Sequence, residues 1–255
     1  MSNEVIPAAL VTGGAQRIGG AIATALASAG YAVAIHTNRS VDTARVLCRT
    51  IVASGGRAEV VTADLADHDA VLSLVARSAV AVGPLTLLVN NAGEFEPDTV
   101  GRLDRALFDR QFAVNLRAPL FLAETFAAQA PAGANASIVN LLDQRVYKLT
   151  PQFVSYTLTK SALYTATTTL AQALAPHVRV NAVAPGPTLP SPRQDAKDFA
   201  EQAATLPLAH GPTPKDIANA VLYLAGAPSV TGVTIAVDGG QHIAWQTPDT
   251  TDITE

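Results

Sequence analysis

Short apolar runs alternate along the chain with longer stretches of helical periodicity. Seven runs have the length and the β-branched or apolar content of strands, at residues 8–12, 31–37, 58–64, 85–93, 137–142, 178–186 and 233–240. Strands that are apolar throughout, instead of alternating with polar residues, are typical of a parallel sheet covered by helices on both faces. The pattern therefore predicts a Rossmann-like, doubly wound α/β fold.

Two segments depart from this pattern. Residues 187–214 contain many prolines and show no clear helical or strand period, and residues from 246 onward are polar and acidic. A chain of 255 residues with 49% hydrophobic content is large enough to bury one core. We therefore expect a single domain over residues 1–255, in which 187–214 form a lid over the substrate and 246–255 form a polar tail.

Composition and charge narrow the range of partners. The formal net charge of −4 comes without a run of Lys or Arg, so a nucleic-acid surface or an anionic-membrane patch has no support. No stretch approaches the roughly 18 consecutive apolar residues of a membrane span. The five histidines lack metal-ligand spacing, so no metal site is expected. A small molecule is the expected partner.

One cysteine and an early first strand bear on the cellular compartment. Cys48 is the only cysteine, so an internal disulfide is impossible. The first apolar run begins at Ala8, too early to leave room for a signal peptide. Both observations favour the reducing cytoplasm.

The residues that follow the first two predicted strands suggest a dinucleotide site. Ligands of doubly wound sheets bind beyond the carboxyl ends of the strands. Residues 12–20, TGGAQRIGG, form a glycine-rich turn before a helical stretch, where backbone N–H groups can meet a phosphate. Residues 36–40, HTNRS, lack the acid that holds the ribose of NAD, and Arg39 and Ser40 suit a 2′-phosphate. NADPH is the predicted cofactor, although Arg39 as a solvated surface charge is an alternative.

A tyrosine and a lysine stand four residues apart in the stretch SYTLTKSAL. On a helix, Tyr156 and Lys160 share one face. An ammonium group beside a phenol favours the phenolate, so we expect a lowered pKa for Tyr156. This would make Tyr156 a proton donor or acceptor near neutral pH.

Four motifs occur in the order and spacing of a known family. The chain contains TGG…G, NNAG, Y-x-x-x-K and VNAVAPG, and it resembles the short-chain dehydrogenase/reductase family over nearly its whole length. The resemblance implies that Asn115 holds a water against Lys160, and that the protein is a homo-oligomer, often a tetramer in this family. The resemblance and the HTNRS stretch together imply a set of cofactor contacts. These are Gly13, Gly14, Arg17, Ile18, Gly19, His36, Asn38, Arg39, Ser40, Asp64, Leu65, Asn91, Ala92, Gly93, Tyr156, Lys160, Pro185, Gly186 and Thr188.

Two departures from the family pattern point to a narrower group. Asp143 stands 13 positions before Tyr156, where the catalytic serine is usual, and Arg17 replaces a glycine of the turn. With Phe95, these residues resemble the pteridine reductases and dihydromonapterin reductases. The resemblance implies that Asp143 takes part in proton delivery with Tyr156, that Arg17 contacts substrate and cofactor phosphate, and that Phe95 stacks on the pterin.

Other interpretations stay open at this point. The protein could be a general carbonyl or quinone reductase in which Asp143 replaces the serine. It could also be an inactive NADPH-binding sensor, although retention of Tyr156, Lys160 and Asn115 argues against that. Asp143 could instead cap a helix or pair with Arg145, and Phe95 could serve loop packing alone.

Overall fold

The computed structural model describes residues 6–191 and 193–246 and contains one seven-stranded sheet. All strand pairs are parallel, in the order β3-β2-β1-β4-β5-β6-β7. The strands are β1 (Ala8–Val11), β2 (Ala32–Thr37), β3 (Arg57–Thr62), β4 (Leu85–Asn90), β5 (Ala136–Leu141), β6 (Val178–Pro185) and β7 (Thr234–Val237). The prediction of a Rossmann-like, doubly wound single domain is confirmed.

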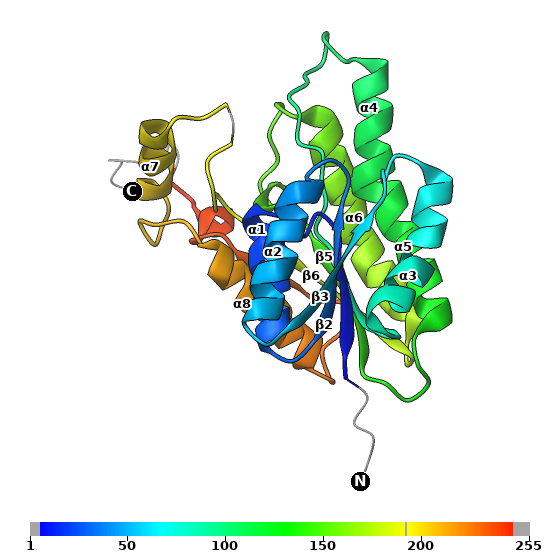
Figure 1. Ribbon diagram of the computed structural model, residues 1–255. Coiled ribbons are helices and arrows are strands. Elements are labelled where there is room, and N and C mark those ends of the chain that lie inside the picture. Colours follow the sequence, from blue (N-terminus) through cyan, green and yellow to red (C-terminus); the bar gives the residue numbers. More distant parts are fainter. Residues whose placement is uncertain (1–5, 192, 247–255) are drawn as a thin grey trace.

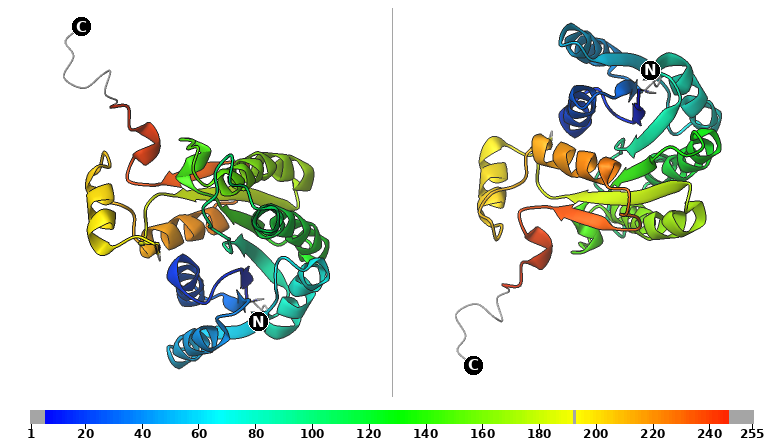
Figure 2. Two further views of the ribbon diagram at one scale, coloured as in Figure 1. Left: turned by 90° about the horizontal axis from the view of Figure 1, so that it is seen from above. Right: turned by 90° about the horizontal axis from the view of Figure 1, so that it is seen from below.

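Helices cover both faces of the sheet (Figures 1 and 2). One face carries α1 (Arg17–Ser28), α2 (Val41–Ala53) and α8 (Pro214–Gly226), and the other carries α3 (His68–Val82), α5 (Ala118–Gln129) and α6 (Val154–Leu174). Because the central strands are buried on both faces, most of their residues are apolar. Helix α4 (Arg105–Phe112) runs through a π-helical turn, η1 (Ala113–Arg117), into α5.

Two predicted strands extend further along the sequence than the observed ones. Strand β4 ends at Asn90, because residues 91–93 leave the sheet in a turn towards the end of β1. Strand β7 ends at Val237, since Gly239 and Gly240 have positive φ angles that extended backbone does not use. Both ends lie at the carboxyl edge, where the site forms.

The segment predicted as a lid contains a helix that the sequence pattern did not reveal. Helix α7 (Ala196–Ala204) begins after Asp195, whose side chain accepts from the backbone N–H of Asp198 at 2.8 Å. No residue of α7 is buried, and Figure 1 shows the helix standing out from the sheet and its layers. Residues 247–255 of the predicted tail lie outside the described residues. Among the helices described here, none has the length and apolar character needed to cross a bilayer.

The start of α6 is fixed by a buried aspartate from a distant loop. The Asp98 carboxylate accepts from the backbone N–H of Ser155 at 3.1 Å and from the Ser155 hydroxyl. The backbone N–H of Phe153 donates to the Asp98 carbonyl at 2.9 Å. Phe153 adopts a left-handed φ of 57°, a conformation that costs a non-glycine residue about 1 kcal/mol or more. Asp98 thus offsets local strain and sets where the helix begins.

Asp98→Ala should lower the free energy of unfolding by about 2 kcal/mol, because it leaves the N–H and hydroxyl of Ser155 buried without an acceptor. Urea denaturation checks this value. Glu124→Ala, at an exposed site on α5, is the matched control and should change stability by less than about 0.5 kcal/mol. Equal effects of the two substitutions would show that Asp98 does not anchor α6.

Candidate active site

The ends of β1 and β4 are tied together at the point where the strand order reverses. The Thr12 hydroxyl accepts from the backbone N–H groups of Asn91 at 2.9 Å and Ala92 at 3.1 Å. The Asn91 side-chain amide donates to the Thr12 carbonyl at 2.9 Å. In open α/β sheets, ligands bind in the crevice at this reversal. The glycine turn and the NNAG segment therefore form one site.

The glycine turn is shaped to receive a phosphate group. Gly13 has a φ of 61°, and a Cβ at Gly19 would collide with the Gly13 carbonyl oxygen. The residue before α1, Gln16, makes no side-chain hydrogen bond to the first N–H groups of the helix. These N–H groups and the helix dipole are thus available to an anion. The turn fits the pyrophosphate of a dinucleotide.

The His36 side chain supports the glycine turn through a hydrogen bond. The Gly13 N–H donates to Nδ1 of His36 at 3.2 Å, and Nε2 lies 3.1 Å from the Ala63 carbonyl. Burial is the main reason that the pKa of His36 falls to about 4. The ring is therefore neutral, with its proton on Nε2, and it supports the turn without adding charge.

Most of the predicted cofactor residues line two adjoining pockets at this edge of the sheet. The adenosine-side pocket is lined by Gly13, Arg17, Ile18, Gly19, His36, Asn38, Asp64, Leu65, Asn91, Ala92 and Gly93. The active-site pocket is lined by Arg17, Ile18, Asn91, Gly93, Phe95, Asp143, Tyr156, Lys160, Pro185, Gly186 and Thr188. Gly14 lies in the turn, where its N–H donates to the His36 carbonyl at 2.9 Å. Arg39 and Ser40 follow β2 but line neither pocket, and Arg39 is exposed.

An arginine that the sequence analysis missed organises the adenosine-side pocket. Arg110 on α4 lies 2.8 Å from Oε1 of Glu94 and 3.3 Å from Oδ2 of Asp64. Partial burial opposes ionisation of Asp64, but the Ala66 N–H and Arg110 outweigh it and hold the Asp64 pKa below its usual value. No motif surrounds Arg110 in the sequence. Its only sequence signal is its position about one helical turn before Val114, which lines the same pocket.

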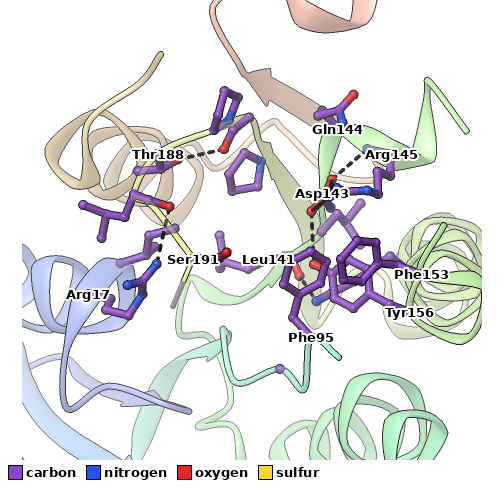
Figure 3. Close-up of a pocket in the computed structure, with 18 of the residues that line it drawn as sticks. Arg17, Phe95, Leu141, Asp143, Gln144, Arg145, Phe153, Tyr156, Thr188 and Ser191 are labelled. Carbon is purple, nitrogen blue, oxygen red and sulfur yellow. Dashed lines mark hydrogen bonds and ion pairs between the residues drawn. The ribbon is translucent and has the colours of Figure 1, made fainter. Parts of the chain in front are cut away.

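The Asp143 carboxylate contacts both Tyr156 and Arg145, the two neighbours expected from the sequence (Figure 3). The Tyr156 hydroxyl donates to Oδ2 of Asp143 at 3.2 Å. The backbone N–H of Arg145 donates to Oδ1 at 2.9 Å, and its guanidinium lies 3.2 Å from Oδ2. Capping of the short helix η2 (Gln144–Val146), ion pairing and contact with Tyr156 therefore occur together. The alternatives considered from the sequence do not exclude one another.

The expected lowering of the Tyr156 pKa is wrong. Burial and the adjacent Asp143 carboxylate raise the pKa of Tyr156 well above its usual value. Lys160 does face the ring, but its Nζ lies 5.7 Å from the ring centroid and donates to the Leu141 carbonyl at 2.7 Å. The ammonium group of Lys160 is evident from the local sequence. The burial of the phenol and the Asp143 carboxylate beside it have no local signal.

Lys160 and Asn115 both lie close to Gly93. A Cβ at Gly93 would lie 3.4 Å from Oδ1 of Asn115 and 3.9 Å from Nζ of Lys160. The Asn115 side chain is fully buried and accepts from the Glu94 N–H at 2.8 Å and donates to the Glu94 carbonyl at 2.9 Å. In the described residues, Asn115 thus uses its amide to fix the backbone beside Gly93.

A pair of stacked rings covers one side of the active-site pocket. Phe95 stacks on Phe153 with ring centroids 4.3 Å apart, and it meets Tyr156 edge to face at 4.7 Å. The Arg145 guanidinium carbon lies 5.2 Å from the Phe95 centroid and 5.3 Å from the Phe153 centroid. These nearly equal distances place it beside the stack instead of over an outer ring face. The sequence analysis missed Phe153, although it stands one helical turn before Tyr156.

Two arginines tie the segment 187–214 to the rest of the molecule. Arg17 donates to the Pro190 carbonyl at 3.0 Å, and its φ of 54° is the left-handed conformation of the glycine that it replaces. Arg193 donates to the Phe95 carbonyl at 2.8 Å and pairs with Glu96 at 2.9 Å. The segment therefore spans the pocket between α1 and the Phe95 loop.

The buried lysine generates a pH prediction. Burial lowers the pKa of Lys160 to about 8 in the folded protein, below its ordinary value of 10.5. The unfolded chain then binds more protons than the folded one between these values, so folding becomes more favourable as the pH rises through this window. The unfolding free energy of the protein relative to Lys160→Met should rise by about 2 kcal/mol from about pH 7.5 to 9.5. Urea titrations at both pH values measure it, and a constant difference would contradict it.

Comparisons with known proteins agree with the geometry. A sequence model of the family described as enoyl-(acyl carrier protein) reductase matches residues 13–242. The 3-oxoacyl-[acyl-carrier-protein] reductase FabG of Staphylococcus aureus is 33% identical over 94% of this chain and 100% of that protein.

Solved structures resemble the chain over nearly its whole length. The structure of FolM alternative dihydrofolate reductase 1 from Brucella canis, complexed with NADP, is 53% identical, covers 96% of this chain and 97% of that chain, and has a TM-score of 0.93. A short-chain dehydrogenase/reductase from Serratia marcescens is 32% identical, with 92% and 98% coverage and a TM-score of 0.87. Together with the glycine turn and the Tyr156–Lys160 pair, these matches establish that the chain belongs to the short-chain dehydrogenase/reductase family of oxidoreductases.

Proposed function

We propose that the protein is an NADPH-dependent reductase of a small, flat, pterin-like ring. The observation that carries this proposal is the contact between Asp143 and the Tyr156 hydroxyl, at the place where a serine is usual in the family. Phe95 beside Tyr156 and Arg17 at the glycine turn support it. The similarity to a Brucella protein described as an alternative dihydrofolate reductase points to the same class of substrate.

The cofactor is held by the cradle at the ends of β1 and β4. The glycine turn and the uncapped start of α1 bind the pyrophosphate, and Asp64 and Asn38 line the adenosine side. Arg39 is the cation that binds the 2′-phosphate, because it follows β2, where enzymes that prefer NAD carry an acid for the ribose. When bound, the nicotinamide supplies the hydride. Lys160 and the segment at Pro185, Gly186 and Thr188 hold the nicotinamide end.

Tyr156 and Asp143 move the proton. Reduction of a ring C=N bond places a hydride on carbon and a proton on nitrogen. The raised pKa keeps Tyr156 protonated at neutral pH, so the phenol is the donor inside the pocket. The Asp143 side chain is 17% exposed and touches the hydroxyl, so it connects Tyr156 to solvent as a proton relay. Lys160 stabilises the phenolate that remains.

The segment 187–214 closes the pocket over the substrate. Its main chain is held by Arg17 on one side and by the contact of Arg193 with the Phe95 loop on the other. Phe199 of α7 lines the same pocket. A homotetramer in the cytoplasm stays a prediction from the family resemblance and the sequence.

A carbonyl reductase is the second candidate, and the observation that favours it is the similarity to 3-oxoacyl reductases. Such a substrate presents one carbonyl oxygen, which the Tyr156 hydroxyl alone can protonate. In this family a serine at the place of Asp143 serves such a substrate, so a carbonyl does not require a carboxylate there. The two candidates therefore differ in what a change at Asp143 does.

The cofactor assignment predicts a preference for NADPH over NADH. A charge-assisted hydrogen bond from Arg39 to the 2′-phosphate contributes about 1.5 to 3 kcal/mol, or a ratio of about 10 to 150 in affinity. Arg39→Ala should remove the preference and leave NADH binding unchanged, as measured by fluorescence titration. Arg45→Ala, an exposed arginine one turn into α2, is the matched control and should keep the ratio. Equal affinity of the unaltered protein for both cofactors would rule the assignment out.

The substrate assignment predicts divergent effects at Asp143. Asp143→Ser should lower kcat/KM for a 7,8-dihydropterin by about 10² to 10⁴, the ordinary scale of general acid catalysis, and spare reduction of 1,4-naphthoquinone. Asp143→Asn keeps an acceptor but cannot titrate, so it should impair dihydropterin reduction to a similar extent.

Tyr156→Phe is the control for the common step, because both substrates need its proton. It should abolish both reactions while cofactor binding survives. Parallel losses with dihydropterin and quinone across the Asp143 variants, or no turnover of dihydropterin by the unaltered enzyme, would favour the carbonyl-reductase candidate.

A further inference from the structure

Two glutamines of the active-site pocket have buried amide oxygens without a partner. Gln144 follows Asp143 directly and is 8% exposed, and Gln241 lies just after β7. Oε1 of each is buried and accepts no hydrogen bond from any group in the part of the chain that the structure describes. Both residues line the pocket that contains Asp143 and Tyr156. Buried amide groups are rarely left unpaired, since each unpaired group destabilises the folded state.

Two other glutamines that line the pocket are paired with each other. Gln194 and Gln202 line the same pocket, and the Gln194 amide donates to Oε1 of Gln202 at 2.9 Å. That pair satisfies its own polar groups across the segment 187–214. Gln144 and Gln241 have no such arrangement, and because their unpaired oxygens are buried, rotation of the side chain would bring the amide to a ligand in the pocket.

Asp143 has little capacity left for a substrate edge. Its carboxylate already accepts from the Arg145 backbone N–H, the Arg145 guanidinium and the Tyr156 hydroxyl. A carboxylate offers about four acceptor positions in all. If Asp143 relays protons through Tyr156, other groups in the pocket must recognise the polar edge of the ring.

The two glutamines lie close to the proton relay. Gln144 belongs to η2, and Gln241 belongs to the short helix η3 (Gln241–Ile243), which contacts η2. Tyr147, which directly follows η2, also lies close to His242 of η3, with ring centroids 5.4 Å apart. Figure 3 shows Gln144 on the same side of the pocket as Asp143, across from Arg17. A ring bound at Tyr156 therefore lies in the same pocket as these amides.

We propose that Gln144 and Gln241 determine substrate specificity by binding a ring edge that carries both N–H donors and a carbonyl acceptor. A primary amide offers an acceptor and donors side by side, and rotation of its last bond exchanges them. Its complement is a lactam or amino-substituted heterocycle, such as a 2-amino-4-oxopteridine, and not a ring with carbonyl oxygens alone. This inference rests on the proposed reduction of pterin-like rings and names the residues that select them.

Gln144→Met and Gln241→Met test the proposal, because methionine keeps the length of the side chain and removes its polar groups. Each should raise the KM for a 7,8-dihydropterin about tenfold, the effect of losing roughly one hydrogen bond, with kcat changed by less than about twofold. The KM for 1,4-naphthoquinone should stay within about twofold. Since Gln144→Met removes a buried unpaired oxygen, its melting temperature should equal or exceed that of the unaltered protein.

Gln172→Met, at an exposed site on α6 outside the pocket, is the matched control and should leave every constant unchanged. An unaltered KM for dihydropterin in both pocket variants, or a rise shared by Gln172→Met, overturns the specificity role and leaves the proposed function standing. An unaltered enzyme that does not reduce dihydropterin overturns the proposed function and this inference together.

Discussion

The site depends on how one carboxylate is held. Asp143 follows the buried residue Leu142 at the end of β5. An uncompensated charge beside such a buried strand is costly. Arg145 offsets that cost twice, through its backbone N–H and its guanidinium. Burial of Tyr156, together with this carboxylate beside its hydroxyl, raises the pKa of the phenol and keeps it protonated. Burial and this charge pair together thus set the protonation state of the phenol that we propose as the proton donor.

Strained backbone supports this arrangement at two other places. Arg17 and Phe153 both have positive φ angles, and each is held by contacts beyond its own turn. Arg17 binds the Pro190 carbonyl, and the N–H of Phe153 binds the carbonyl of Asp98. Strain in non-glycine residues persists where the surroundings fix it, and such positions gather at functional sites. Here they join the phosphate turn and the helix of Tyr156 to the walls of the pocket.

The sequence was sufficient for the features that local pattern determines. Buried parallel strands, the glycine turn and the Tyr156–Lys160 face each have a short-range signal, and all three are found. Contacts between distant segments had none, so Arg110 with Asp64 and Arg193 with Phe95 were missed. The pKa of Tyr156 was misjudged for the same reason. Its dominant neighbour lies 13 residues away, and burial follows only from the complete fold.

Asp143 and Arg145 form a coupled pair at the position where a serine is usual in the family. Removing the Arg145 side chain would leave a partly buried carboxylate with only a backbone N–H and the phenol beside it, and removing Asp143 would leave a guanidinium against two phenylalanine rings without its anion. Residues coupled in this way respond to substitution as a unit and not additively. The two side chains, together with the ring pair that Arg145 flanks, are therefore best regarded as one replacement for the usual serine.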